Sequence, residues 1–389
     1  MVLNAGEDTD SVKKFILVAG ARPNFMKIAP ILRAMEARKE MTATLVHTGQ
    51  HYDANMSDSF FSSLGIRPPD YNLEAGSASH AVQTANIMVR FEEVCKKERP
   101  DCVVVVGDVN STIATGLVAK KMHVALAHVE AGLRSGDRDM PEEINRIATD
   151  AITDIFFTTE KQGTENLLSE GHDPSSVHFV GHVMIDNLFF QLRKLDTAPV
   201  SPIVRKLRES IAGKYVCMTM HRPSNVDSRE VLNQLLDAIQ SVSREAPVIF
   251  PCHPRTRKQI ENYRLQGCFR EFDGESRIDS GIILMDPLGY DDFLYLWKDA
   301  ALVLTDSGGM QEETTALRVP CITMRENTER PITKEIGTNE VAGTDAETIR
   351  NLAGAALEGK WKESRVPELW DGCASERIVE AMEDPCLAL

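Results

Sequence analysis

The sequence predicts an α/β fold with two doubly wound, Rossmann-like domains in one chain. The 389 residues exceed the length at which a single hydrophobic core usually stops growing, so two domains are expected. Short apolar runs alternate with helical patterns in both halves of the chain. A segment with linker composition lies between Asp186 and Ser210. We therefore expect the two domains to span residues 14–190 and 191–370.

The predicted strands follow one another as a parallel sheet with crossover helices requires. In the first half they are Phe15 to Ala19, Ala43 to His47, Cys102 to Val106, Val124 to Val129, Ile155 to Thr158 and His178 to Val180. In the second half they are Tyr215 to Thr219, Val248 to Pro251, Gly281 to Met285, Ala301 to Thr305 and Cys321 to Thr323. Such sheets bind ligands outside the carboxyl ends of their strands, so we expect the active site there, in the cleft between the domains.

The composition excludes several classes of protein. The formal net charge of −15 argues against general affinity for nucleic acid or for an anionic membrane. The sequence has no run of about eighteen apolar residues, and its polar first segment, residues 1–13, is expected to be disordered. The eight cysteines are scattered without a CxxC pair, which is typical of reduced thiols in a cytoplasmic protein.

The sequence also lacks the common fingerprints of nucleotide and metal sites. It has no GxxxxGK[ST] loop, and GARPNFMK rather than GxGxxG follows the first strand, which argues against P-loop enzymes and dinucleotide dehydrogenases. A strand precedes His47 and His51, and no HExxH occurs, so we expect no metal site. No GxSxG or cysteine–histidine pattern marks a nucleophile, which leaves acid–base chemistry by carboxylates.

Two acids follow the ends of predicted strands. Asp108 comes after the most continuously apolar strand of the chain, and Glu130 comes after the next strand. Because the carboxyl ends of parallel strands meet at one edge of a sheet, both carboxylates are expected at the site. The alternative for Asp108 is to cap the helix that starts near Ser111.

A third acid begins the next helix. Glu142 stands after Pro141 in the first helical turn, and Arg146 follows one turn later. The alternative is structural, with Glu142 and Glu143 as helix-start acids and a surface i,i+4 ion pair to Arg146. Three acids from neighbouring segments nevertheless form a candidate set for general acid–base catalysis.

The second half contains a candidate phosphate site. The segment TDSGGMQEE places Ser307, Gly308 and Gly309 in a turn that opens a helix, where backbone amides approach a phosphate closely. Glu313 lies about one turn into this helix, within reach of a ribose hydroxyl. The alternative is a helix cap at Ser307, with the glycines needed for packing.

Cationic and donor side chains follow two further strand ends. Arg22 and Lys27 lie in GARPNFMK after the first strand, and His221 and Arg222 lie in TMHRPSN after the first strand of the second half. We expect them to converge on one diphosphate, to which arginine offers bidentate contacts.

Together these residues resemble the non-hydrolysing UDP-N-acetylglucosamine 2-epimerases, over nearly the whole chain. The motifs that carry the resemblance are GARPNFMK at Gly20 to Lys27, HTGQH at His47 to His51, GDVNST at Gly107 to Thr112, HVEAGLRSGD at His128 to Asp137, PEEINR at Pro141 to Arg146, HR at His221 to Arg222, TDSGGMQEE at Thr305 to Glu313 and TERP at Thr328 to Pro331.

The resemblance implies the GT-B architecture, with a terminal helix over residues 371–389 that crosses back onto the first domain. It implies interconversion of UDP-N-acetylglucosamine and UDP-N-acetylmannosamine for cell-surface polysaccharides, through removal of the sugar C2 proton, elimination of UDP and its re-addition. It also implies a homodimer that uses no cofactor.

Roles for individual residues follow from the same resemblance. The acid/base and C2-directed groups would be Asp108, Glu130 and Glu142, without assignment to the faces of C2. The diphosphate would be held by Arg22, Lys27, His221, Ser307, Gly308 and Gly309, with His221 counted as catalytic. The remaining substrate-binding residues would be Glu313 at the ribose, Leu288 and Phe293 at the uracil, and Arg146, Arg222 and Arg330.

Two motifs depart from the usual bacterial pattern. GARPN stands where GTRPE is usual, and HRPSN stands where HRRE is usual. The departures leave open a 2-epimerase of a modified substrate, such as a UDP-2,3-diacetamido sugar uronate, and a GT-B glycosyltransferase is a further alternative. Some family members bind a second UDP-N-acetylglucosamine as activator after GQH, where this chain has Tyr52 and Asp53, so activation stays undecided.

Overall fold

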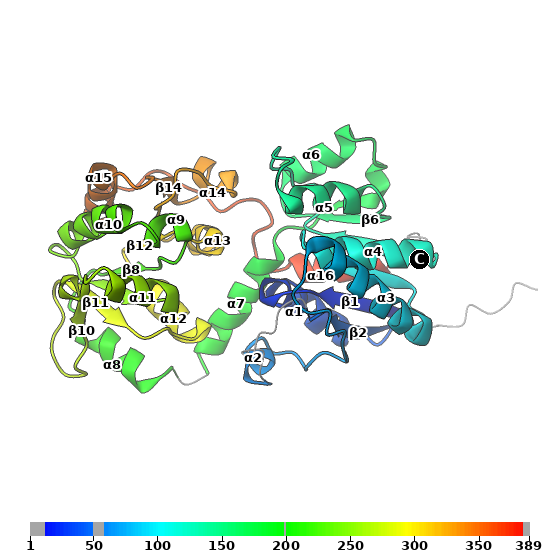
Figure 1. The fold of residues 1–389 in the computed structure, drawn as a ribbon, viewed down its shortest axis with the longest axis horizontal. Helices are drawn as coiled ribbons and strands as arrows, with labels where there is room; N and C mark the ends of the chain where they lie inside the picture. Colours follow the sequence, from blue (N-terminus) through cyan, green and yellow to red (C-terminus); the bar gives the residue numbers. More distant parts are fainter. Residues whose placement is uncertain (1–11, 50–57, 198–199, 384–389) are drawn as a thin grey trace, which may run out of the picture. The chain divides into compact units, whose positions relative to one another are not determined.

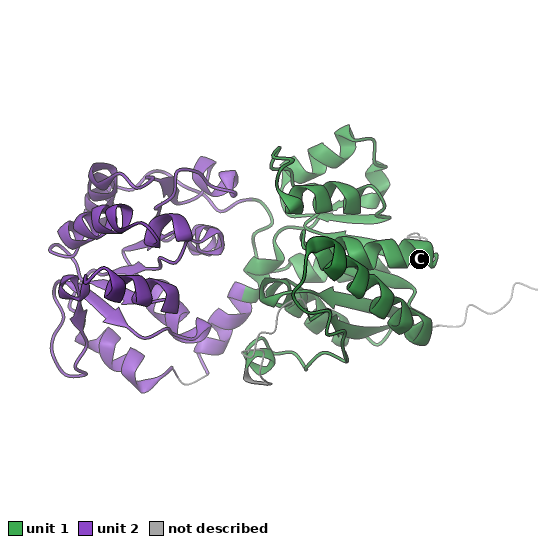
Figure 2. Ribbon diagram, viewed as in Figure 1, with its two compact units in different colours: residues 1–187, 368–389 green, residues 188–367 purple. Residues whose placement is uncertain are grey.

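A computed structural model describes residues 12–49, 58–197 and 200–383 of the chain. The chain forms two compact units, each built around a parallel sheet that has seven strands among these residues (Figures 1 and 2). Unit 1 comprises Met1–Asn187 and Glu368–Leu389, and unit 2 comprises Leu188–Pro367. The prediction of two doubly wound domains is confirmed.

The sheet of unit 1 has the strand order β3-β2-β1-β4-β5-β6-β7, and every pair is parallel. Its strands are β1 (Lys13–Ala19), β2 (Met41–His47), β3 (Tyr71–Asn72), β4 (Cys102–Val106), β5 (Ala125–Val129), β6 (Ile155–Thr158) and β7 (Val177–Phe179). Its helices are α1 (Arg22–Glu36), α2 (Asp58–Ser63), α3 (His80–Glu98), α4 (Asn110–Lys121), α5 (Pro141–Asp150), α6 (Lys161–Ser169) and α16 (Ala374–Glu383), while α7 (Val183–Leu195) continues into unit 2.

Both faces of this sheet are covered by helices. Alternate residues of the central strands, such as Val104 of β4, pack with α1 and α16, and the intervening ones, such as Val103, pack with α3 and α4. A strand buried on both faces reads as an unbroken apolar run, which is the signal that predicted β4. The polar groups that follow the strands therefore lie at the edge of a rigid, fully covered sheet.

The terminal helix α16 packs on unit 1 and is anchored by a buried carboxylate. The Asp186 side chain accepts hydrogen bonds from the first N–H groups of α16, those of Ala374 (3.0 Å) and Ser375 (2.6 Å). The Lys13 ammonium donates to the Met382 carbonyl at 3.1 Å, near the other end of the helix. These contacts satisfy backbone groups that a helix leaves without partners at its ends.

Replacing Asp186 by alanine should loosen α16 selectively. Loss of a capping acceptor usually costs about 1–2 kcal/mol, and here two buried N–H groups would lose their partner. Hydrogen exchange measured by mass spectrometry should show faster exchange in α16, with α3 as the internal control. Unchanged exchange in α16 would contradict the anchoring role.

The sheet of unit 2 has the order β10-β11-β9-β8-β12-β13-β14, again with parallel pairs. Its strands are β8 (Val216–Met218), β9 (Val248–Pro251), β10 (Arg270–Glu271), β11 (Ile282–Met285), β12 (Leu302–Thr305), β13 (Cys321–Thr323) and β14 (Asn339–Val341). Its helices are α8 (Pro202–Ser210), α9 (Pro223–Val226), α10 (Arg229–Val242), α11 (Pro254–Asn262), α12 (Tyr290–Trp297), α13 (Gly308–Leu317), α14 (Pro331–Glu335) and α15 (Ala346–Leu357).

Several details differ from the sequence prediction. Strand β1 begins at Lys13 rather than Phe15, and the edge strands β3, β10 and β14 were not predicted. Of the segment predicted to be disordered, residues 1–11 lie outside the described residues. Tyr52 and Asp53 also lie outside them. Within the described ranges no helix is long and apolar enough to cross a membrane, and the cysteines are free thiols.

Candidate active site

In unit 1, two of the predicted acids lie at the carboxyl ends of adjacent strands. Strands β4 and β5 pair in register up to Val106 and Val129, after which Asp108 and Glu130 follow. Glu130 is 5% exposed and has a left-handed backbone, with φ of 67°. A bulky residue adopts this conformation at an energetic cost, and such strain concentrates at functional sites.

The buried Glu130 carboxylate forms an ion pair with the Lys27 ammonium, which α1 supplies. Gly107 lies directly beside this pair. A Cβ atom on Gly107 would stand 3.5 Å from Lys27 Nζ and 3.8 Å from Glu130 Oε2, and its φ is +70°. Glycine therefore suits both the backbone turn and the space beside the pair.

Asp108 forms a second ion pair, with Arg146 of α5. Arg146 Nη2 lies 2.6 Å from Asp108 Oδ2. The side-chain amide of Asn145 donates a hydrogen bond to the backbone carbonyl of Asp108 at 2.9 Å. The alternative of a helix cap is wrong, because α4 begins after Val109 and has no side-chain cap. The Asp108 side chain thus lies beside a cation, in a partly open position.

Arg146 also pairs with Glu143, which the sequence prediction did not include in the site. Arg146 Nη1 lies 2.9 Å from Glu143 Oε2, and the carboxylate accepts the N–H groups of Ser135 and Gly136, each at 3.0 Å. Burial opposes ionisation, but these donors and Arg146 outweigh it and lower the pKa of Glu143. The ion pair is therefore partly buried and spaced i,i+3, and the predicted surface i,i+4 pair is wrong.

Glu142 and Arg22 stand apart from these pairs. Glu142 lies half-buried in the first turn of α5, and no hydrogen bond or ion pair engages it within the described part of the chain. The Arg22 guanidinium lies over the Phe60 ring, 5.0 Å from its centroid. The structure therefore does not bring Glu142 or Arg22 into contact with Lys27, Asp108 or Glu130.

Beneath the acids lies a buried network that the sequence did not reveal. His128 of β5 is fully buried, with Nδ1 2.7 Å from Asp150 Oδ1 and Nε2 2.9 Å from the Gly107 carbonyl oxygen. Asp150 Oδ2 in turn accepts hydrogen bonds from Arg134 (2.7 Å) and from the Gly132 N–H (3.1 Å). The network connects the end of α5 with the turn that carries Asp108.

In unit 2, the turn after β12 has the geometry of an anion site. Helix α13 begins at Gly308, and the Ser307 side chain makes no capping hydrogen bond. Cβ atoms on Gly308 or Gly309 would meet nothing within 4 Å, so the glycines are not needed for packing. The capping alternative is therefore wrong, and there is open space where the Cβ atoms of Gly308 and Gly309 would stand.

The preceding residue, Asp306, organises the turn after β8. Its fully buried carboxylate accepts the N–H groups of His221 and Arg222, each at 2.8 Å, and its Oδ1 lies 3.0 Å from His221 Nδ1. Burial opposes ionisation, but His221 and these donors outweigh it and lower the pKa of Asp306. Asp306 thus joins two of the predicted diphosphate-binding segments. The sequence prediction did not include Asp306, although its position directly after β12 could have indicated it.

A second histidine lies beside this pair. His253, after β9, has its ring centroid 5.6 Å from that of His221, and its Nδ1 accepts the Arg255 N–H at 3.2 Å. Burial and the neighbouring His221 lower the pKa of His253. His253 therefore favours the neutral form. Of these two histidines, His221 is the one that contacts the Asp306 carboxylate.

The predicted nucleotide contacts form two further groups. Glu313 on α13 is buried and accepts a hydrogen bond from the Tyr290 hydroxyl at 2.8 Å. Phe293 lies half-buried on α12, the helix that also carries Tyr290. Leu288 precedes this helix. Arg330 precedes α14 and forms an ion pair with Glu312. Burial and the nearby Glu313 carboxylate raise the pKa of Tyr290 well above its usual value.

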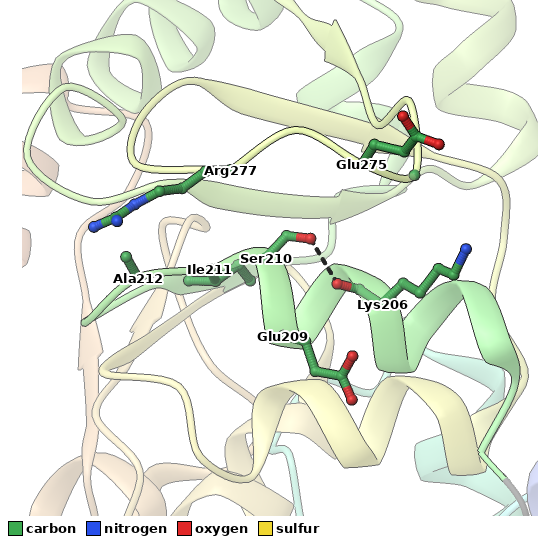
Figure 3. Close-up of a pocket in the computed structure, with 8 residues that line it drawn as sticks. Lys206, Glu209, Ser210, Ile211, Ala212, Glu275 and Arg277 are labelled. Carbon is green, nitrogen blue, oxygen red and sulfur yellow. Dashed lines mark hydrogen bonds between the residues drawn. The ribbon is translucent and has the colours of Figure 1, made fainter.

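Unit 2 also has a surface pocket that is formed by residues other than the predicted site residues (Figure 3). It is lined by Lys206, Glu209, Ser210, Ile211, Ala212, Gly274, Glu275 and Arg277, none of which is a predicted site residue. Among the residues that the structure describes, no three histidine, cysteine or acidic side chains gather as metal ligands. The strand-end residues remain the candidate site.

Comparison with known proteins identifies the family of the chain. The family model described as UDP-N-acetylglucosamine 2-epimerase matches residues 33–383. A Methanococcus maripaludis protein named UDP-N-acetylglucosamine 2-epimerase is 40% identical over 348 residues, covering 89% of this chain and 92% of the relative. A Pseudomonas aeruginosa protein named UDP-2,3-diacetamido-2,3-dideoxy-D-glucuronate 2-epimerase is 38% identical over 371 residues, covering 94% and 98%.

A solved structure is similar over almost the same length. The crystal structure of Methanocaldococcus jannaschii UDP-GlcNAc 2-epimerase, in complex with UDP-GlcNAc and UDP, matches with a TM-score of 0.76 and 39% sequence identity. The match covers 95% of this chain and 99% of that one. The similarity extends through both sheets.

Proposed function

The chain belongs to the UDP-N-acetylglucosamine 2-epimerase family of isomerases, and we propose that it interconverts UDP-N-acetylglucosamine and UDP-N-acetylmannosamine. The observation that carries the proposal is the pair of adjacent strand ends in unit 1, where Glu130 and Asp108 are each held by a cation. Inversion at C2 needs a group that removes a proton on one face and a group that returns one on the other.

In unit 1, the carboxylates act on C2 of the sugar. A base removes the C2 proton, the electron pair forms the C1–C2 double bond, and the C1–O bond breaks to release UDP. Protonation at the opposite face of C2 and re-addition of UDP at C1 complete the inversion. Asp108, Glu130 and Glu142 are the proposed acid/base and C2-directed groups, and Lys27 and Arg146 fix two of them.

In unit 2, the proposed task is to hold UDP as it departs. Negative charge develops on the diphosphate when the C1–O bond breaks, and the Ser307–Gly309 amides with His221 are suited to stabilise it. Arg222 and Arg330 of unit 2, with Arg22 and Lys27 of unit 1, would add cationic contacts to UDP. Glu313 would bind the ribose.

Proton NMR in deuterium oxide tests the function directly. With UDP-N-acetylglucosamine and no additive, the protein should produce UDP-N-acetylmannosamine and place deuterium at C2 of both epimers, because the removed proton exchanges with solvent. Heat-denatured protein is the control. Unlabelled, unchanged substrate would contradict the proposal.

A modified substrate is the second candidate. The Pseudomonas aeruginosa relative is named for a UDP-diacetamido uronate, and its 38% identity is close to the 40% of the relative named for UDP-N-acetylglucosamine. The same NMR experiment with both sugar nucleotides decides between them through the ratio of the two kcat/KM values. A glycosyltransferase is not supported by the family to which the chain belongs.

We also propose a cytoplasmic homodimer. The resemblance to the family supports the homodimer, and the scattered cysteines without CxxC pairs support a reducing compartment. Light scattering coupled to size exclusion measures the mass in solution, and about twice the 43.2 kDa of one chain is expected.

A further inference from the structure

His128 carries the inference, because both of its ring nitrogens face oxygen atoms. Nδ1 lies 2.7 Å from the Asp150 carboxylate and Nε2 lies 2.9 Å from the Gly107 carbonyl. A carbonyl oxygen and an ionised carboxylate only accept hydrogen bonds, so each ring nitrogen must carry a proton to make its contact. A neutral imidazole would place a lone pair against one of these oxygens.

The surroundings favour the proton on the histidine rather than on the carboxylate. Asp150 also receives the Arg134 guanidinium at 2.7 Å and the Gly132 N–H at 3.1 Å, which stabilise its ionised form. Arg134 is paired in turn with Glu170, and Glu130 adds a further negative charge near His128. Burial opposes charge on His128, but Asp150, Gly107 and Glu130 outweigh it and raise the pKa of His128.

The position of this imidazolium relates it to the catalytic acids. The Gly107 carbonyl belongs to the peptide that joins Gly107 to Asp108, and a trans peptide directs its N–H opposite to its C=O. The hydrogen bond from His128 therefore fixes the plane of this peptide and the start of Asp108. His128 lies on β5, and Glu130 follows directly after the last residue of this strand. The buried charge of His128 is therefore linked to Asp108 through the Gly107 carbonyl and to Glu130 through the backbone.

We propose that His128 is a charged positioning residue, which holds the Gly107–Asp108 peptide and thereby sets the placement of Asp108 and Glu130 for the reaction. This inference rests on the proposed function for its catalytic consequence. Asp150 and Arg134 are the supports that keep the imidazolium in place. The histidine itself does not contact the substrate.

The charge is tested in the unmodified full-length protein. After labelling of the histidine rings with 15N, NMR at about pH 8, where an ordinary histidine is neutral, should show one histidine with two protonated nitrogens protected from exchange with water. His182 is the internal contrast, because its Nδ1 accepts the Met184 N–H at 3.2 Å and so carries no proton. Absence of a protected, doubly protonated ring overturns the proposal.

The positioning role is tested with His128→Gln, which keeps a polar side chain but not the charge. We expect kcat to fall about 10²-fold because the acids are misplaced, while the Kd for UDP and the KM stay within about twofold. His182→Gln, another buried histidine of unit 1, is the matched control and should keep its kcat.

The outcomes separate this inference from the proposed function. Unchanged kcat in folded His128→Gln, or equal loss of UDP binding and kcat, overturns the positioning role. If His128→Gln does not fold, the spectrum of the unmodified protein still decides the charge. An unmodified protein that epimerises neither sugar nucleotide contradicts the proposed function, whereas the NMR result stands independently of activity.

Discussion

Replacing Glu130 by glutamine is expected to lower kcat about 10³-fold, within the range that loss of a general acid or base produces. The carboxylate is 5% exposed and paired with Lys27, and glutamine fills the same space without accepting a proton. UDP binding should change less than about threefold, because the proposed contacts to the nucleotide lie mainly in unit 2. Steady-state epimerisation and calorimetric titration with UDP measure the two quantities.

The control for this substitution is Glu92→Gln on α3. Glu92 is partly exposed and forms a surface ion pair with Lys96 at 3.3 Å, so its loss should leave kcat unchanged. Thermal unfolding of both variants shows whether a drop in activity reflects misfolding. Full activity in folded Glu130→Gln would remove Glu130 from the mechanism.

The fold was predictable where burial imposes a pattern on the sequence. Central strands such as β4 are covered on both faces and read as apolar runs. The strands that escaped prediction, β3, β10 and β14, contain two or three residues each and lie at sheet edges. They have one hydrogen-bonded neighbour and little apolar surface to bury, so propensity alone cannot separate them from loops.

The candidate site was predictable as residues that follow strand ends, but the contacts among these residues were not. Topology places Asp108 and Glu130 at adjacent strand ends, and the sequence reveals that order. Which cation meets which acid depends on local backbone angles, such as the left-handed φ of Glu130 that accompanies its contact with Lys27. Asp306 and His128 were missed because each acts on a segment distant in sequence.

Asp306→Asn is the second substitution with a large expected effect. Asparagine can still accept the N–H groups of His221 and Arg222, but it cannot stabilise a charged His221 or fix its tautomer. We expect kcat to fall about 10²-fold, the loss associated with one preorganised donor to a developing anion. Asp345→Asn, at the cap of α15, is the matched control because its carboxylate likewise accepts a backbone N–H, that of Thr348, at 2.8 Å.

A double-mutant cycle gives this prediction its sharpest form. If Asp306 acts only through His221, the change from aspartate to asparagine should cost little once His221 has been replaced by glutamine. The kcat of the double variant should then lie within about threefold of that of His221→Gln alone, because residues that act as a unit are not additive. Additive losses would instead assign Asp306 an effect through Arg222 or through the fold of the β8 turn, and the pair would no longer describe one catalytic group.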